Sequence, residues 1–256
     1  MIDQLWLVLL GFAGGILGSM IGLGGGIIVV PVLTFLGFSP TAAASNSLFA
    51  ALSNAVASTI SYSKQKRIEY SLGLKLGLLS VPGTILGAII SSDVAPDIFK
   101  VLFGLVLVAS AVYIFLRRNL ESRQKTISKQ MMVFAIGASF FAGIISSFFG
   151  IGGGIVFVPL MVAGMGMAMK RAAPTSQLIL LFASLSGVIT HSLLGHPDFT
   201  QAGLLAIGSF IGGLVGARLS IDIKERYLQI LVSVVILIAA GKLFYDSATG
   251  FGVVGF

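Results

Sequence analysis

The chain contains no cysteine among its 256 residues. This absence excludes disulfide bridges, thiolate metal sites and persulfide chemistry on the protein. Charge is also scarce, because only 10% of the residues are Asp, Glu, Lys or Arg, whereas an ordinary soluble domain carries roughly a quarter. The apolar fraction is 56% and the mean hydropathy is +1.04, which is more apolar surface than a soluble core can bury. The sequence therefore predicts an all-α integral membrane protein that resides in a lipid bilayer.

Ionisable and catalytic side chains are rare inside the apolar segments. The chain has two histidines, and no acidic residue lies deep in any apolar segment. A carboxylate relay for protons or a carboxylate sodium site therefore has no candidate, although backbone and hydroxyl oxygens remain available for sodium. No carboxylate pair, Ser-His-Asp set or histidine cluster supports catalysis. We expect neither an enzyme nor a bound cofactor or metal.

Ten apolar segments can be marked along the chain. A helix needs about 20 residues to cross about 30 Å of hydrocarbon. Six segments meet this length, the first, second and seventh are short, and the sixth is borderline. The N-terminus lacks a basic region and a clear cleavage site, so the first segment is expected to be retained. The segments span residues 4–20, 22–37, 42–62, 71–92, 97–116, 130–148, 150–165, 172–194, 201–219 and 227–245.

A glycine cluster occurs twice, once near the start of each half of the chain. Residues 22–31 read GLGGGIIVVP and residues 150–159 read GIGGGIVFVP, with seven of ten positions identical at an offset of 128. Glycine triplets and proline break helices, so each cluster predicts either two short tilted crossings or a re-entrant hairpin. Paired helix breaks in two halves are the best sequence indication of a transporter's binding site.

The repeat continues beyond the clusters at an offset of 129. We therefore expect two five-segment halves, residues 1–116 and 130–256, joined by the polar linker 117–129. Small residues at spacing of four, such as Gly83 with Gly87, are expected only to bring helices close together. The matched pairs include Asn46 with Thr175, Ser47 with Ser176, Tyr62 with His191, Glu69 with Asp198, and Gly83 with Gly212.

Lysine and arginine predict how the halves are oriented. Thirteen of the sixteen gather in four places that segment counting puts on one side, namely residues 64–67, 117–129, 170–171 and 218–226. The connectors on the other side, residues 38–41, 93–97 and 195–200, contain neither residue. Short basic loops stay in the cytoplasm, so both termini are expected outside. This distribution also explains the net charge of +7 without nucleic acid as a partner.

Matching loops carry opposite charge patterns. Loop 63–70 is basic while its counterpart 192–199 has no Lys or Arg, and loop 93–97 is not basic while its counterpart near 218–226 is. The two halves are therefore expected to form an inverted repeat, a recurring plan of secondary transporters.

The glycine clusters and two polar runs make up the predicted substrate site. Glycine lets backbone N–H groups turn toward an anion, and a half-helix N-terminus adds partial positive charge; the alternative is close helix packing. Hydroxyl and amide donors suit oxyanions, and the alternative for them is hydrogen bonding between helices or capping. The predicted contacts are Gly24, Gly25, Gly26, Ser45, Asn46, Ser47, Gly152, Gly153, Gly154, Thr175, Ser176 and Gln177, with Ser19 and Ser147 as weaker candidates.

Two further side chains are candidates for proton or anion contact. His191 lies near the outer end of its segment, where histidine can carry a proton near neutral pH, although such residues are more often satisfied interfacial side chains. Arg171 lies one turn before Thr175, where it would attract an anion to the cytoplasmic mouth.

A short membrane protein with GxGGG[IV]xxVP near the start of each half resembles the TauE/SafE sulfite exporter family of prokaryotes. In that family a run of small residues leads to a Thr-Ser or similar pair after each motif, and here the runs are AAASNSL at 42–48 and RAAPTSQL at 171–178. The family usually shows Thr where this chain has Asn46. The resemblance covers essentially the whole chain, and it implies transport of sulfite, thiosulfate or organosulfonates in a prokaryotic plasma membrane.

The expected function is a secondary transporter for a small sulfur-containing anion. Export is the expected direction, because one negative charge leaving an inside-negative cell gains about 2.3 kcal/mol per 100 mV. Two alternatives stay open: a passive anion channel, and a membrane assembly protein without transport. A homo-oligomer is also left open.

Overall fold

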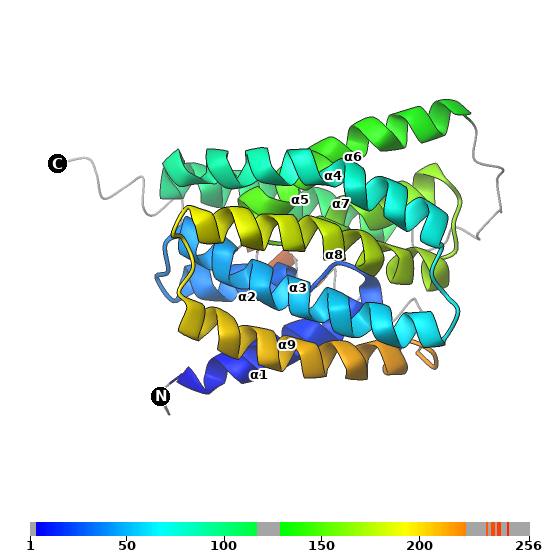
Figure 1. Cartoon of the computed structure of the whole chain (residues 1–256). Helices are drawn as coiled ribbons and strands as arrows, with labels where there is room; N and C mark the ends of the chain where they lie inside the picture. The colour runs from blue at the N-terminus through cyan, green and yellow to red at the C-terminus, as the bar shows by residue number, and fades with distance from the viewer. Residues whose placement is uncertain are drawn as a thin grey trace.

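The computed structural model describes residues 4–116 and 129–223, together with Val234, Leu237, Ile238, Ala240, Gly241 and Tyr245. Within these residues the secondary structure is helical, and no strand occurs (Figure 1). The predicted linker 117–129, except its last residue, and nearly all of the tenth segment lie outside the described residues. The helices are α1 (Trp6–Ile21), α2 (Gly26–Phe35), α3 (Pro40–Lys64), α4 (Tyr70–Ile90), η2 (Ser91–Asp93), α5 (Pro96–Leu116), α6 (Lys129–Phe149), α7 (Gly154–Pro159), η3 (Leu160–Gly164), α8 (Met169–Leu193) and α9 (Phe199–Leu219).

The helices agree with the first nine predicted segments, with one change in length. Four described helices, α4, α6, α8 and α9, are long and apolar enough to cross a membrane. The sixth segment was expected to be borderline, but α6 begins at Lys129 and offers a 20-residue apolar stretch, Gln130–Phe149. Helix α3 has 25 residues, and its many serines and asparagines lower its hydropathy. The short segments are confirmed as short, because α2 has 10 residues and α7 has six.

The bundle has an apolar outside, and its apolar core also holds buried polar side chains. Large apolar side chains are exposed on α4, α5, α6 and α9, as on Leu78, Leu105 and Phe141. Many of the buried polar side chains lie on α3 and α8, among them Asn54 and Gln177. This arrangement is expected where lipid is the solvent and polar groups must find partners inside the bundle.

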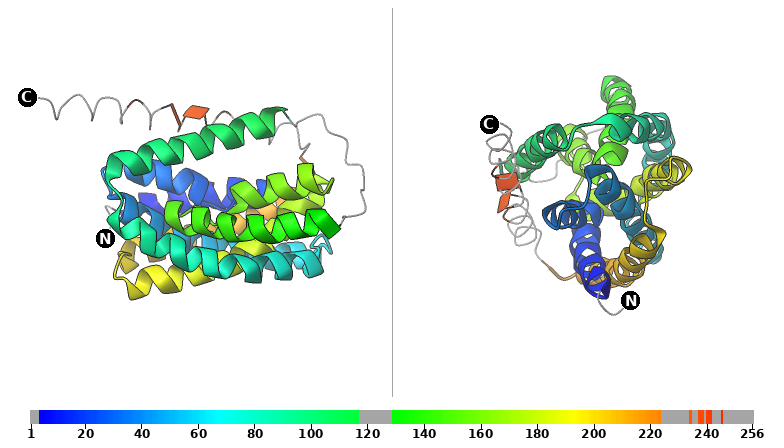
Figure 2. Two further views of the ribbon diagram at one scale, coloured as in Figure 1. Left: turned by 90° about the horizontal axis from the view of Figure 1, so that it is seen from above. Right: turned by 90° about the vertical axis from the view of Figure 1, so that its left-hand side faces the viewer.

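The helices run roughly along one direction, so their connectors gather at two ends (Figures 1 and 2). The basic end holds the α3–α4 connector, at the right of Figure 1, and the residues after α9. Here Arg67 donates to the Lys170 carbonyl over 3.0 Å and to Ser220 Oγ over 3.0 Å. The non-basic end holds the connectors before α3, α5 and α9, where Thr41 donates to the Ser91 carbonyl. The predicted grouping of the basic loops is therefore present in the structure.

Helix starts and stops follow local sequence chemistry. Helix α3 begins after Ser39, which accepts from Ala42 N–H at 3.3 Å, with Pro40 in the first turn. Helix α9 begins after Asp198, whose carboxylate accepts from two backbone N–H groups at 2.9 and 3.2 Å. Lys66 and Gly195, which match in the repeat, both adopt a left-handed backbone just after α3 and α8.

Small residues bring pairs of helices into contact in a matched way. Helix α1 packs along α9, and α6 packs along α4. A Cβ added at Gly212 would overlap the Phe12 carbonyl, and one added at Gly83 would overlap the Phe140 carbonyl. The prediction that these glycines allow close helix packing is thus confirmed.

Candidate functional site

The two glycine clusters reverse the chain inside the bundle. Gly14 of α1 lies against Gly25 and Val29, so α2 folds back along α1. In the second half, Gly153 lies against Ala142 and Ser146 of α6. Each cluster therefore separates two packed helices rather than continuing one helix.

The two reversals lie directly against each other. A Cβ on Gly26 would overlap the Gly150 carbonyl, and a Cβ on Gly154 would overlap the Gly22 carbonyl. The third glycine of each triplet is therefore needed for this crossing, which is the close-packing role. The crossing also brings the middle of the two halves together at one place.

The first position of each glycine triplet needs glycine for a different reason. Gly24 has φ +77° and Gly152 has φ +73°, in the left-handed region where a side chain is strained. Both face Leu180 of α8. Gly25 and Gly153 differ, because Gly25 has an ordinary φ of −67° and Gly153 has φ +82°.

The polar run of α8 donates to two carbonyl groups at the first helix break. Ser176 Oγ donates to the Gly22 carbonyl at 2.7 Å, and Gln177 Nε2 donates to the Gly18 carbonyl at 2.9 Å. Gln177 Oε1 is buried and has no partner among the described residues. Gln177 therefore presents an acceptor at this point, while its donors are directed at the backbone.

Five buried serine hydroxyls have no hydrogen-bond partner in the described part of the chain: Ser47, Ser146, Ser147, Ser184 and Ser209. Three have their Oγ within 3.3 Å of where the Cβ of a glycine in the two triplets would stand, Ser47 at Gly26, Ser184 at Gly152 and Ser209 at Gly25. Unpaired buried hydroxyls are costly and rare in native interiors. These three hydroxyls therefore lie next to the glycine crossing.

Sequence reasoning found Ser47 and named Ser147 as weaker, but it missed Ser146, Ser184 and Ser209. The indication was available, since each is a hydroxyl inside a long apolar helix. The sequence could not show which of the many such serines donate their hydroxyl to a carbonyl of their own helix. Ser80, the repeat partner of Ser209, does so by donating to the Gly77 carbonyl at 2.7 Å.

Asn46 and Thr175 hold the start of the next helix pair in place. Asn46 Oδ1 accepts from the Asp198 N–H at 3.0 Å, and Thr175 Oγ1 accepts from the Glu69 N–H at 3.0 Å. Asp198 and Glu69 are the residues just before α9 and α4, so the two bonds match in the repeat. The Asn46 side-chain oxygen therefore accepts from a backbone N–H, as the Thr175 hydroxyl does in the other half. Ser45 donates to the Ala42 carbonyl, within its own helix.

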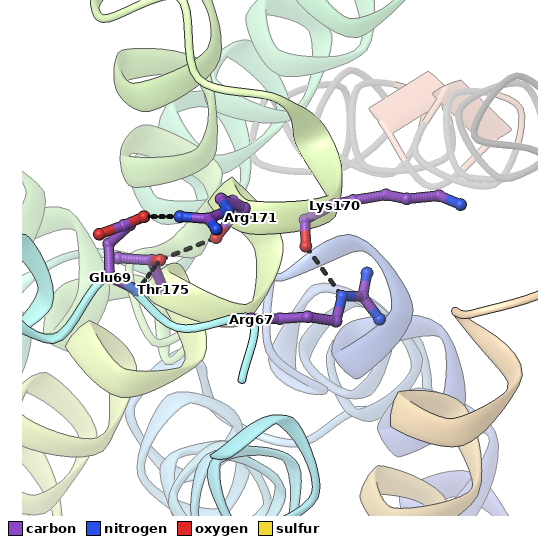
Figure 3. Close-up of polar contacts among 5 residues, drawn as sticks. All are labelled: Arg67, Glu69, Lys170, Arg171 and Thr175. Carbon is purple, nitrogen blue, oxygen red and sulfur yellow. Dashed lines mark hydrogen bonds and ion pairs between the residues drawn. The ribbon is translucent and has the colours of Figure 1, made fainter. Parts of the chain in front are cut away.

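Arg171 lies at the basic end, on the surface. Its side chain is 57% exposed and forms an ion pair with Glu69 (Figure 3). Thr175 also donates to the Arg171 carbonyl at 2.7 Å, so this corner joins the start of α8 to the start of α4. The structure places Arg171 at the edge of the bundle and not at the glycine crossing.

His191 is buried, rather than interfacial as such residues usually are. Its Nε2 lies 3.2 Å from the Ser147 carbonyl, and its Nδ1 lies 2.8 Å from Nδ1 of His196. Its repeat partner Tyr62 is also buried and donates to the Ser19 carbonyl at 2.8 Å. The pair of histidines therefore sits at the non-basic end, next to the last turn of α6.

The comparisons with known proteins agree with this architecture. The family model described as "Sulfite exporter TauE/SafE" matches residues 7–243. The probable membrane transporter protein YunE of Bacillus subtilis is 30% identical over 94% of this chain and 97% of its own length. The probable membrane transporter protein MJ0441 of Methanocaldococcus jannaschii is 28% identical over 89% of this chain and 90% of its own. The probable membrane transporter protein YfcA of Escherichia coli is 24% identical over 91% of this chain and 86% of its own length. No solved structure matches the chain significantly.

Proposed function

Because the chain belongs to the sulfite exporter TauE/SafE family of membrane transporters, we propose that it moves small sulfur-containing anions across the membrane as a secondary transporter. The substrate class is sulfite, thiosulfate or an organosulfonate, and the direction is export. The inside-negative potential favours outward movement of an anion by about 2.3 kcal/mol per charge and 100 mV. The family consists of membrane transporters, not enzymes. The activity to measure is therefore movement of a solute across the membrane.

The observation that carries this proposal is the set of unpaired serine hydroxyls at the glycine crossing. A sulfur oxyanion presents several oxygens around one centre, and each oxygen accepts hydrogen bonds. Hydroxyls supply donors without a buried fixed cation, whose cost inside a membrane is high. Ser47, Ser184 and Ser209 come from three different helices, so small helix movements would make and break the site.

The proposed mechanism uses an inverted repeat with two re-entrant hairpins, α1–α2 and α6–α7. Matched hydrogen bonds support it, since Asn46 and Thr175 bind the starts of α9 and α4 in the same way. In such a repeat the two halves exchange conformations about a central site, which opens alternately to each side. The crossing of the glycine clusters would be that centre.

A pair of serine variants tests the site. In proteoliposomes, Ser209→Ala is expected to raise the KM for sulfite or thiosulfate counterflow about tenfold, because a hydrogen bond to a charged group contributes about 1.5–3 kcal/mol. Ser80→Ala is the control, since Ser80 is buried at the matching position but its hydroxyl is spent on Gly77. Equal KM values for the two variants would remove Ser209 from the site.

Counterflow also separates the proposal from its alternatives. A passive anion channel would conduct without saturable exchange, and an assembly protein would show no anion flux. Among the described residues the connectors between long helices are short, which favours transport over a role that needs a large exposed interaction domain.

A further inference from the structure

The ends of the bundle are held by two contacts at matching positions of the repeat. At the basic end, Tyr62 donates to the Ser19 carbonyl, and Arg67 lies 5.2 Å from the Tyr62 ring. At the non-basic end, His191 and His196 occupy the two positions that match Tyr62 and Arg67. We call the first the tyrosine–arginine contact and the second the histidine contact.

The matching extends to the partners. Ser19 and Ser147 lie three residues before the first glycine of each cluster, so both contacts tie the last turn before a helix break to α3 or α8. Arg67 reaches Ser220 Oγ at 3.0 Å, and His196 Nε2 lies 3.3 Å from Ser92 Oγ. Both contacts therefore also reach the residues that follow α9 or α4. The two contacts therefore have similar positions in the repeat, but one uses tyrosine and arginine and the other uses two histidines.

The histidine contact requires a defined placement of protons. The Ser147 carbonyl only accepts, so His191 Nε2 carries a proton, and a neutral His191 then has an acceptor at Nδ1. His196 Nδ1 must donate to it across 2.8 Å, which leaves His196 Nε2 to accept from the Ser92 hydroxyl. With both rings neutral, each of these hydrogen bonds is satisfied. With both rings protonated, two N–H groups would face each other and the bond between the rings could not form.

The surroundings favour the neutral rings. The Ser147 carbonyl of α6 contacts His191, and the Ser92 hydroxyl of η2 contacts His196. No carboxylate in the described ranges forms an ion pair with either histidine, and Asp198 spends Oδ1 on the N–H groups of Thr200 and Gln201. A buried charge without a partner is costly. Partial burial also lowers the pKa of His196, which lies in the connector.

We propose that the histidine contact is a proton-binding site that keeps the non-basic end closed while both rings are neutral and opens it when protons bind. The tyrosine–arginine contact contains neither an imidazole nor a carboxyl group, so we expect closure of the basic end not to respond to acid. The proposal builds on the proposed transport function, because it states how one end of the transporter opens.

Labelling of single cysteines tests this without transport, because the chain has no cysteine of its own. Ser147→Cys is placed under the histidine contact, and a membrane-impermeant maleimide is added at pH 7.5 and pH 5.5. Labelling is divided by that of exposed Leu193→Cys at the same pH, which cancels the effect of pH on the thiol. The ratio is expected to rise about tenfold in acid, the effect of losing about one hydrogen bond. Ser19→Cys, under the tyrosine–arginine contact, is expected to stay constant.

His196→Gln removes the exposed titratable ring and keeps an amide that can reach His191. The acid response of Ser147→Cys is expected to vanish in this background, while Arg67→Gln at the matching position leaves it intact. A response that persists in His196→Gln, or that is absent in the parent protein, overturns the proposal. If labelling responds to acid but thiosulfate counterflow is absent at both pH values, the transport function is wrong and the proton site stands.

Nitrogen NMR of histidine-labelled protein gives a second measurement that needs no variant. The two histidines of the contact are the only ones in the chain. At pH 7.5 the spectrum is expected to show two neutral rings of fixed tautomer, with one Nδ1–H shared between them. Two rings that titrate independently and show no coupling between their Nδ1 atoms would contradict the contact.

Discussion

Gly26 gives the sharpest test of the glycine crossing. A Cβ placed there would overlap the Gly150 carbonyl, and it would lie 2.8 Å from both the Ile151 Cα and Ser47 Oγ. Two of these three atoms belong to backbone, which cannot move aside as a side chain end can. Inserting one methyl group into a packed interior costs about 1–3 kcal/mol. Gly26→Ala is therefore expected to lower the unfolding temperature in detergent by roughly 3–10 °C.

Gly203→Ala in α9 is the matched control. It makes the same chemical change within a helix, and a Cβ there meets nothing within 4 Å. Replacing a helical glycine by alanine in open space is expected to stabilise the protein by about 0.5–1 kcal/mol. The two variants should therefore shift the unfolding temperature in opposite directions, measured by loss of monodisperse protein on heating. If Gly26→Ala were as stable as Gly203→Ala, the two glycine clusters would not cross as described.

Three further predictions concern the contacts around the site. Asn46→Thr is expected to retain counterflow because threonine keeps the acceptor for the Asp198 N–H. Asn46→Ala should lower the unfolding temperature by a few degrees, because it leaves this partly buried N–H unpaired; equal stability of the two variants would contradict the role of Asn46. Arg171→Ala should change stability by less than about 1 kcal/mol, because its ion pair is exposed, and a several-fold rise in KM would instead reveal a role in attracting the anion. Cysteines at Lys64 and Leu193, matched and exposed at the ends of α3 and α8, should be labelled from opposite sides of the membrane, and labelling from the same side would contradict the inverted repeat.

The sequence predicted most of the helices because their signals are local. Apolar segments of sufficient length, bounded by polar or glycine residues, gave the positions of α1 to α9, and the paired glycine clusters gave the positions of two helix breaks. Close packing at Gly83 and Gly212 was also predictable from spacing alone. The sixth segment was judged borderline at residues 130–148, and α6 is longer by Lys129 and Phe149.

The candidate site was harder to predict because the role of each polar residue depends on contacts distant in sequence. Asn46 and Thr175 were predicted to contact a substrate, and in the structure each side chain accepts from a backbone N–H that lies 152 or 106 residues away. Ser176 was in the same predicted set, and its hydroxyl is spent on Gly22. A buried serine hydroxyl has a hydrogen-bond partner only where the fold brings a carbonyl close to it. No pattern in the sequence gives the distance between that hydroxyl and that carbonyl.

The burial of His191 shows the same limit. Its place near the end of a segment indicates an interfacial residue, and the packing of α6 against α8 brings the Ser147 carbonyl next to its ring. The repeat matched Tyr62 with His191, and in the structure Tyr62 makes the corresponding bond to the Ser19 carbonyl.

Counterflow of labelled sulfite and thiosulfate in proteoliposomes, repeated under an imposed voltage, tests the central claim most directly. The account predicts saturable exchange of at least one of these anions, with a rate that responds to voltage because net charge moves. Folded protein that exchanges neither anion nor an organosulfonate would contradict the account of the glycine crossing as a site for sulfur-containing anions.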